Sequence, residues 1–439
     1  MTVASTQHLR RLGLLITIVS FLVIAYATLL PEPGGPLEVH LCLICGSLGA
    51  VDAILNVLLF VPLGVGLALC GVSAKRALLI VTVVSVLIET TQFFIIPGRD
   101  ATIGDVLTNT IGGTFGFVTS RYACIWLRPP PRIATVLIVA WGAIWLVIQT
   151  TAGFAFAPSI PESQYYGQLA RPLGKNFAVF HGRVLAASVD DISIPNVALA
   201  ESHGVRQRLL DGATVAATVI PAEPTPGIAP IVRVADADQR QIVLLAQNGA
   251  DLLFSIHSGA EVLRLRPPIL ALPRVFPIGV LNDRAQAAAL VELSGRYLSR
   301  EVRLHARTSS ATNGSLIPLT VSLGWTLVLP TQWFIEGTRA EVVISLIWIA
   351  VLMVPLGYWT FHFLHSFSER AVGVQILPTV FWLGSLAILG SGLGLAPEFF
   401  GLSPTPVREW LGGLAGLLLG ARLVTRAKPI VDTLGLDRE

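Results

Sequence analysis

Long apolar stretches, separated by short polar ones, make up most of the chain outside its middle third. A helix needs about 20 apolar residues to cross a bilayer. We predict membrane spans in eight stretches: Leu12–Leu30, Val51–Cys70, Ala77–Ile96, Ile103–Trp126, Ile133–Thr151, Val342–Thr360, Val374–Leu393 and Val407–Val424. This pattern is typical of a polytopic α-helical membrane protein with about eight spans.

The pattern changes between about Glu162 and His305, where short runs with β-branched residues alternate with turns. We predict strands at Thr214–Ile220, Gln241–Gln247, Leu252–His257, Glu261–Leu265, Ala288–Leu293 and Glu301–His305. Asn248-Gly249 is a strong hairpin signal, and Ser258-Gly259 links the next predicted pair. The rhythm predicts an all-β sandwich, similar to a jelly roll, as an external domain.

Four regions follow from these patterns. Residues 1–50 hold an N-terminal anchor helix and an external loop, and residues 51–152 hold the next four spans. Residues 153–338 form the external β domain, whose apolar end at Leu316–Leu329 we interpret as a last strand or an interfacial stretch. Residues 339–439 form a C-terminal unit with three spans.

The positions of basic residues predict the orientation, because Lys and Arg concentrate in cytoplasmic loops. Basic residues precede the first span and follow the second, fourth and eighth spans. They are Arg10, Arg11, Lys75, Arg76, Arg121, Arg128, Arg132, Arg422, Arg426 and Lys428. Both termini are therefore predicted in the cytoplasm and the β domain outside. We expect the first span to be an uncleaved anchor, because its apolar run is longer than that of a usual signal peptide.

Composition agrees with a membrane protein and excludes other classes. Hydrophobic residues make up 53% of the chain and charged residues only 13%. The net charge of +3 gives no support for nucleic acid binding. No histidine or cysteine has metal-ligand spacing, so we expect no metal and no cofactor. Cys42 and Cys45 have redox-motif spacing, but we interpret them as small apolar residues.

The clearest chemical signal is a set of polar residues within spans two to four. These residues are Asn56, Glu89, Gln92, Arg99, Asp105 and Asn109. Ionisable residues in lipid are costly, so they normally face a partner or a cavity. Asp105 and Asn109 share a helical stripe with Gly112 and Gly116, which allow another helix to approach closely.

Three interpretations of this set remain open. It could be a structural hydrogen-bond network, a binding pocket open to the outer leaflet, or a catalytic site with Glu89 as acid or base. Arg99 could engage a phosphate or a carboxylate. No histidine is close enough in the sequence to activate Ser85, so nothing identifies a nucleophile.

The order of these motifs resembles the VanZ-like family of bacterial envelope membrane proteins. The resemblance covers about 70 residues: Asn56…Phe60-Val-Pro-Leu-Gly64, Glu89-x-x-Gln92-x-Phe94 and Arg99-x5-Asp105-x3-Asn109-x-x-Gly112…Gly116. It implies a role connected with glycopeptide (teicoplanin) resistance and marks the six polar residues as candidate ligand-binding positions. The stretch from Gly212 to His257 resembles laminin-G or concanavalin-like sandwiches, which implies carbohydrate or protein binding.

The last three spans resemble an eroded copy of spans two to four. Val354–Gly357 is similar to Val61–Gly64, and Gly412–Gly416 is similar to Gly112–Gly116. This alignment places Glu409 opposite Asn109 and leaves no counterpart for Asp105 or Arg99. We therefore expect a parallel repeat in which the first copy carries the site.

The predicted function is recognition of an envelope glycan, a lipid-linked precursor or a glycopeptide-like compound at the outer leaflet. Two alternatives remain: a membrane enzyme that acts on a lipid-linked phosphate or glycan, and an assembly protein whose sandwich binds an envelope partner. The expected location is the bacterial inner membrane, with membrane lipids as partners.

Overall fold

The computed structural model describes residues 3–31, 39–40, 44, 46–96, 101–174, 177–223, 225–276, 290–308, 311–368 and 376–434. The chain divides into two compact units. The first comprises Met1–Trp145, Ala350–Leu389 and Gly413–Glu439, and the second comprises Leu146–Ile349 and Gly390–Gly412. Each unit is described separately.

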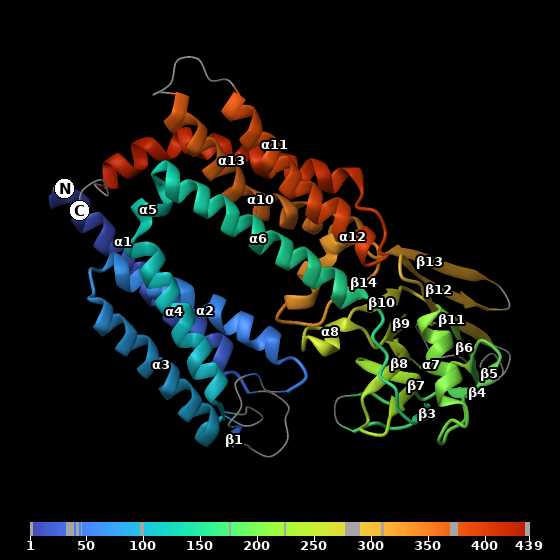
Figure 1. Ribbon diagram of the computed structural model, residues 1–439. Coiled ribbons are helices and arrows are strands. Elements are labelled where there is room, and N and C mark those ends of the chain that lie inside the picture. Colours follow the sequence, from blue (N-terminus) through green and yellow to red (C-terminus); the bar gives the residue numbers. More distant parts are fainter. Residues whose placement is uncertain are drawn as a thin grey trace. The chain divides into compact units, whose positions relative to one another are not determined.

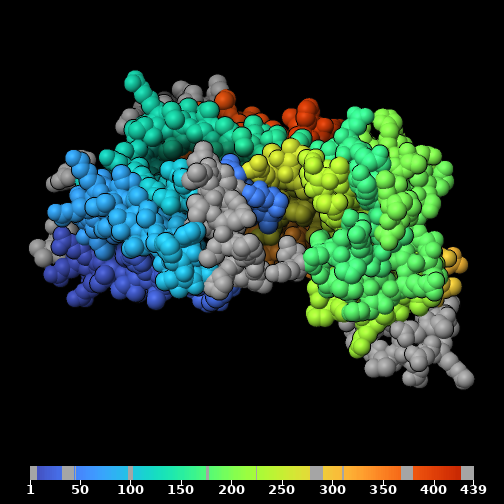
Figure 2. Space-filling model, turned by 90° about the horizontal axis from the view of Figure 1, so that it is seen from below, coloured from blue at the N-terminus to red at the C-terminus, as the bar shows by residue number. Residues whose placement is uncertain are grey.

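The first unit begins with a bundle of helices that lie side by side in Figure 1. They are α1 (Val3–Leu29), α2 (Gly49–Leu69), α3 (Ala74–Ile95), α4 (Ile103–Arg121) and the short α5 (Ala123–Leu127). Ile24, Phe60, Leu63, Val81 and Phe117 form the buried centre of this bundle. Side chains of the blue and cyan helices fill the spaces between their ribbons on the face shown in Figure 2. Many of their other apolar side chains remain exposed, as expected for helices solvated by lipid.

The remaining helices carry the chain into and out of the β domain. They are α6 (Pro131–Phe156), α10 (Arg339–Ser368), α11 (Ile376–Gly390), α12 (Ala396–Phe399) and α13 (Val407–Leu434), with a π-helical turn at Ser391–Leu395 between α11 and α12. Indole groups connect α6 to two of these helices. Trp141 donates to the carbonyl oxygen of Leu352 at 2.7 Å, and Trp145 donates to that of Ile388 at 2.8 Å.

Six helices among the described residues are long and apolar enough to cross a membrane: Gln7–Leu29, Gly49–Leu69, Ala74–Ile95, Pro131–Phe156, Arg339–Ser366 and Thr379–Phe399. They coincide with six of the eight predicted spans, so the prediction of a multi-pass membrane protein is confirmed. The other two predicted spans fall on α4 and α13, which are helical. Asp105, Asn109 and several glycines make α4 less apolar, and Arg408, Glu409 and Arg422 do the same for α13.

The second unit contains a β domain with two six-stranded sheets. Sheet 1 has the strand order β14-β10-β9-β8-β7-β3, and sheet 2 has the order β13-β12-β11-β6-β4-β5. Sheet 1 comprises β3 (Tyr165–Leu169), β7 (Ile228–Asp236), β8 (Gln241–Asn248), β9 (Asp251–Ile256), β10 (Ile269–Leu272) and β14 (Phe334–Ile335). Sheet 2 comprises β4 (Arg183–Val189), β5 (Ile192–Ser193), β6 (Thr214–Ile220), β11 (Val291–Tyr297), β12 (Glu301–Arg307) and β13 (Thr312–Pro318).

The two sheets differ in what covers them. Residues along β8 and β9 are buried on both faces, so their sequences read as nearly continuous apolar runs. Strands β6, β11 and β12 alternate, with a buried inward residue followed by a polar outward one. The inward faces meet closely, because a Cβ at Gly295 would lie 2.5 Å from the ring of Phe254. Apart from the parallel pair β10–β14, the strands of both sheets pair antiparallel.

Most predicted strands are confirmed. Thr214–Ile220 is β6, the hairpin at Asn248-Gly249 joins β8 to β9, and Gly249 has φ +57 as its turn requires. Residues 288–289 of the predicted strand Ala288–Leu293 lie outside the described residues, and its end belongs to β11.

One prediction was wrong in this domain and another was right only in part. Glu261–Leu265 is not a strand: Ser258 and Glu261 form a capping box that starts the helix α8 (Gly259–Val262). Leu316–Leu329 is only partly a strand, since β13 ends at Pro318 and Val321–Val328 is a buried 3-10 helix.

Candidate functional site

Helices α2 and α4 pack with their backbones in contact. A Cβ at Gly112 would collide with the carbonyl oxygen of Val57, and one at Gly116 would collide with that of Val61. Only glycine permits this approach, because any side chain would push the helices apart. The contact places the polar residues of α4 next to those of the neighbouring helices.

Three polar contacts connect the antiparallel helices α3 and α4. The hydroxyl oxygens of Thr82 and Thr110 lie 3.4 Å apart, and Asn109 Nδ2 donates to Ser85 Oγ at 3.0 Å. One turn further along α3, Glu89 Oε2 accepts from the backbone N–H of Thr102 at 3.0 Å. We call the side chains of Ser85, Glu89, Asp105 and Asn109 the polar ladder.

The start of α4 joins the ladder to α2. Thr102 is the N-cap, and its Oγ1 accepts from the backbone N–H of Asp105 at 2.9 Å. The short parallel pair of β1 (Val39–His40) and β2 (Ala101–Thr102) directly precedes this cap. Asp105 Oδ1 accepts from Asn56 Nδ2 at 2.6 Å, so α2 is bonded to the first turn of α4.

The structure brings together most, but not all, of the predicted residues. Asn56, Glu89, Asp105 and Asn109 engage at the junction of α2, α3 and α4. Gln92 instead bonds to α1, where its Nε2 donates to the carbonyl oxygen of Thr28 at 2.9 Å. Arg99 lies outside the described residues, so its place in the site stays a prediction.

Three side chains of the ladder are buried within the helices, and Asp105 is half-buried. Ser85 is 0% exposed, Asn109 2% and Glu89 8%. Asn109 Oδ1 is buried and has no hydrogen-bond partner among the described residues. A buried acceptor without a partner costs about 1–3 kcal/mol, so it normally marks a strained or functional position.

The chemistry available to this site is hydrogen bonding and charge. Among the described residues, no group of three or more His, Cys, Asp and Glu side chains could hold a metal ion. Ser85 Oγ is engaged by Asn109, an amide that cannot act as a base for a nucleophile. The arrangement can therefore accept hydrogen bonds from donors of a ligand, and Glu89 offers one carboxyl group to it.

Several contributors escaped the sequence analysis. Thr102 bonds to Glu89 and Asp105, the hydroxyls of Thr82 and Thr110 lie 3.4 Å apart, and the carbonyl oxygen of Thr28 accepts from Gln92. Isolated threonines in apolar helices give no signal of their own. Ser85 was considered only as a nucleophile, although its position one helical turn before Glu89 on α3 gives the two side chains a shared face.

Basic side chains gather at the opposite ends of these helices. Lys75 and Arg121 line a cavity of about 710 Å³ between the start of α3 and the end of α4. Arg10 belongs to the same end, since a Cβ at Gly71 would lie 3.9 Å from its Nη2. The helices thus carry basic groups at one end and the ladder towards the other.

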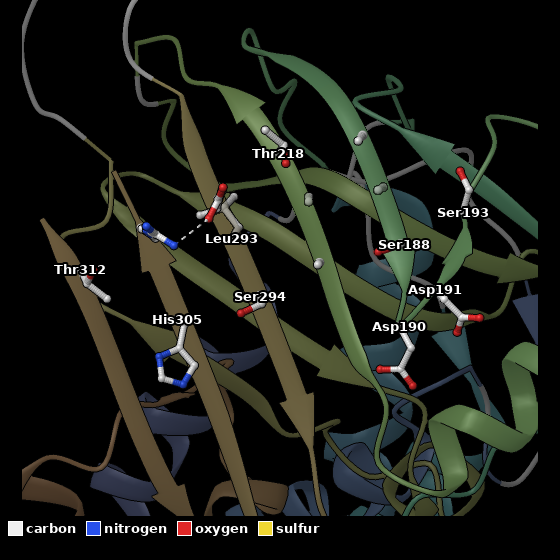
Figure 3. Close-up of a pocket in the computed structure, with 15 residues that line it drawn as sticks. Ser188, Asp190, Asp191, Ser193, Thr218, Leu293, Ser294, His305 and Thr312 are labelled. Carbon is white, nitrogen blue, oxygen red and sulfur yellow. Dashed lines mark ion pairs between the residues drawn. The ribbon is translucent and has the colours of Figure 1, made fainter. Parts of the chain in front are cut away.

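A second candidate site is an open pocket on the outer face of sheet 2, with a volume of about 660 Å³ (Figure 3). Its floor contains a cross-strand row of small side chains, Ser188, Ala216 and Ser294. Asp190 and Asp191 lie on one side of the pocket and His305 on the other. Arg307 and Glu292 form an ion pair at 3.9 Å across the neighbouring row. The described lining has no Phe, Tyr or Trp, so a ligand would be held by hydrogen bonds and charge.

Comparison with known proteins identifies the family of the N-terminal segment. Residues 8–126 match the model of the VanZ/LLP1 family. The match covers most of α1, all of α2 to α4 and most of α5, so this segment is similar to the VanZ/LLP1 family, as the ordered motifs predicted. No curated protein and no solved structure matches the chain. The resemblance of the β domain to laminin-G or concanavalin-like proteins stays a prediction.

Proposed function

We propose that this VanZ-family membrane protein recognises an envelope glycan, a lipid-linked precursor or a glycopeptide-like compound at the outer leaflet. The observation that carries the proposal is the polar ladder, in which Glu89 and Asn109 are buried within helices of apolar composition. Glu89 accepts from a backbone N–H, and the Asn109 oxygen has no partner among the described residues. Sugars and peptides supply the donors that such groups accept from.

The charge distribution supports the proposed orientation. Arg10, Lys75 and Arg121 lie at one end of the bundle, and basic residues concentrate on the cytoplasmic side. Glu89 follows Lys75 by fourteen residues, which is about 21 Å along a helix. The ladder is then in the outer half of the membrane. Eight spans, with α4 and α13 included, complete this topology, with both termini in the cytoplasm and the β domain outside.

The pocket on sheet 2 is the proposed glycan-binding surface of the β domain. Small side chains in its floor allow a polymer to lie close to the strands, and hydroxyl groups of Ser188, Ser294 and Thr218 line it. This use agrees with the resemblance to laminin-G and concanavalin-like jelly rolls, which implied carbohydrate binding.

The test is thermal unfolding of the detergent-purified protein with and without added compounds. The probes are a lipid-linked peptidoglycan precursor, soluble peptidoglycan fragments and teicoplanin. A compound that binds the native state raises the midpoint of unfolding. We expect the lipid-linked precursor to raise the midpoint of the wild type and not that of Glu89→Gln. If none of the three probes raises the midpoint of the wild type, the proposal is wrong.

A second candidate function is catalysis on a lipid-linked phosphate or glycan, and the burial of Glu89 is what favours it. A buried carboxyl group can serve as an acid or base. Incubation of the precursor with the wild type distinguishes the two functions. Product formation that is lost in Glu89→Gln shows an enzyme, and unchanged precursor that still stabilises the wild type shows a binding protein.

A further inference from the structure

A pocket of about 470 Å³ opens in the β domain where strand β3 ends beside the β7–β8 turn. It is distinct from the pocket on sheet 2, with which it shares no residue. Its lining consists of Gln168, Arg171, Pro172, Leu173, Gly174, Phe177, Arg233 and Gln239. The described lining thus contains two arginines and no acidic residue.

Arg233 is a buried cation at the base of this pocket, with 7% of its surface exposed. It lies in β7, a strand that is buried along nearly its whole length. Its Nη1 donates to Gln168 Oε1 at 2.6 Å, and its Nη2 donates to the carbonyl oxygen of Gln239 at 2.6 Å. Its Nε is buried without a partner among the described residues. All of the acceptors in these bonds are neutral.

The charge of Arg233 is therefore not paired within the pocket. The carboxylate whose charge interacts with the Arg233 guanidinium is that of Asp236. This carboxylate already accepts two hydrogen bonds at 2.8 Å, from the backbone N–H and the Nε of Arg240. Burial lowers the pKa of the Arg233 guanidinium from its usual value, yet arginine remains charged in proteins. A buried charge without a partner is costly, so an anion would stabilise this position.

Arg171 adds a second positive charge at the mouth of the pocket. It is exposed and follows β3 by two residues. Arg171 forms no ion pair or hydrogen bond with another described residue, whereas most other arginines described in the β domain form ion pairs or bonds to carboxylates and carbonyls. Pro172, Leu173 and Phe177 give the pocket an apolar wall.

Two backbone positions beside the pocket are strained. Ala170 has φ +45 and Gln239 has φ +61, a region that residues with a side chain rarely adopt. Such a conformation costs on the order of 1 kcal/mol and tends to occur where function requires it. At Gln239 the strained backbone directs both the carbonyl oxygen and the side-chain oxygen to Arg233.

We propose that this pocket binds an oxyanion, a carboxylate or phosphate group, carried on a small apolar group. Arg171 and Arg233 hold the oxyanion, and Leu173, Pro172 and Phe177 contact the apolar part. Charge-assisted bonds from guanidinium groups are the strongest available to such an anion. The site belongs to the β domain alone, and its test does not depend on the ligand of the polar ladder.

The experiment is isothermal titration calorimetry on the full-length protein in detergent, with phenyl phosphate, benzoate and inorganic phosphate as probes. We expect phenyl phosphate or benzoate to bind the wild type more tightly than inorganic phosphate does, and more weakly as salt rises. Removing one charge-assisted contact in Arg171→Gln should weaken binding about tenfold or more. Arg171 is exposed, so this variant should melt like the wild type.

Arg183→Gln is the matched control, because Arg183 is another exposed arginine of the β domain, on β4. Its affinity should equal that of the wild type. A second variant, Phe177→Ala, should weaken phenyl phosphate and leave inorganic phosphate unchanged. Absence of binding at millimolar probe, equal losses in Arg171→Gln and Arg183→Gln, or equal affinities for phenyl phosphate, benzoate and inorganic phosphate would each overturn the proposal.

Discussion

Two helix pairs, α2 with α4 and α10 with α13, share one packing device but carry different polar residues. Gly112 and Gly116 of α4 pack against the carbonyl oxygens of Val57 and Val61. In α13, Gly416 and Gly420 pack in the same way against those of Ala350 and Val354. Both partner helices contain a proline followed two residues later by a glycine, Gly64 or Gly357, that faces the opposite backbone.

This packing corrects the register of the predicted repeat. The motif comparison aligned Gly412 with Gly112, but contacts with the partner helix make Gly416 the equivalent residue. Glu409 precedes Gly416 by seven residues, as Asp105 precedes Gly112, so Glu409 corresponds to Asp105 and not to Asn109. The prediction was wrong because glycines recur every four residues along α13 and either pair fits the motif.

The two pairs differ in their polar contacts. Asp105 bonds to Asn56 on the partner helix α2, whereas the side chain of Glu409 accepts a bond of 2.5 Å from Ser322 in the 3-10 helix Val321–Val328 and not from α10. The position equivalent to Asn109 is Gly413, which has no side chain. The scaffold is thus shared, while the polar residues that α4 contributes to the ladder are not repeated in α13.

The largest expected effect comes from breaking the shared scaffold. Gly112→Val and Gly416→Val should each destabilise the protein by about 3 kcal/mol or more, because the new side chain collides with a backbone carbonyl. Thermal unfolding in detergent measures this. Gly384→Ala on α11 is the control, since nothing lies within 4 Å of its Cβ position. Tolerance of Gly416→Val would show that the second pair does not share the packing.

A smaller effect should separate the ladder from its counterpart. Asp105→Asn and Glu409→Gln each weaken a charge-assisted hydrogen bond, with an expected loss of about 1–3 kcal/mol in the free energy of unfolding. Only Asp105→Asn should also reduce the stabilisation by the lipid-linked precursor. Equal loss of stabilisation in both variants would remove the functional distinction between the pairs.

A still smaller effect tests one hydrogen bond in each half. Ser85→Ala deprives Asn109 of its partner, and Ser385→Ala deprives Thr360, whose hydroxyl lies 2.8 Å from that of Ser385. Both variants should lose about 1 kcal/mol of stability. We expect only Ser85→Ala to change the affinity for the precursor. A changed affinity in Ser385→Ala would contradict the functional distinction between the two halves.

The stability of the β domain should depend on pH through Tyr165, and this dependence is a reference for the helix variants. Burial raises the pKa of Tyr165 from 10.0 to about 12. Because the pKa of Tyr165 is higher in the folded state than in the unfolded state, its contribution to the stability of the fold is complete below pH 10. This contribution is lost as the pH rises towards 12. Tyr165→Phe should flatten the dependence of stability on pH between pH 10 and 12, measured by the circular dichroism of the β-sheet. It should not change the effects of the helix substitutions. An unchanged pH profile in Tyr165→Phe would contradict the assignment of this pH dependence to Tyr165.

The sequence predicted the elements well and their partners less well. Apolar length located the six candidate membrane helices, and period-two alternation located β6 and β12, because those signals are local. The bond from Gln92 to α1 was not predictable, since residues on one helical face can contact different neighbours. The helix at Glu261 was not predicted either, because a capping box outweighed a short β-like run there. Buried polar residues marked the ladder, but their pairing depends on helix register that only close packing sets.

The most direct test of the central claim is the affinity for the lipid-linked peptidoglycan precursor in three proteins: wild type, Glu89→Gln and Glu409→Gln. The account predicts that Glu89→Gln weakens binding about tenfold or more, at an unfolding midpoint close to that of Glu409→Gln. Glu409→Gln should bind like the wild type. Equal affinities in all three proteins would contradict the assignment of ligand recognition to the polar ladder.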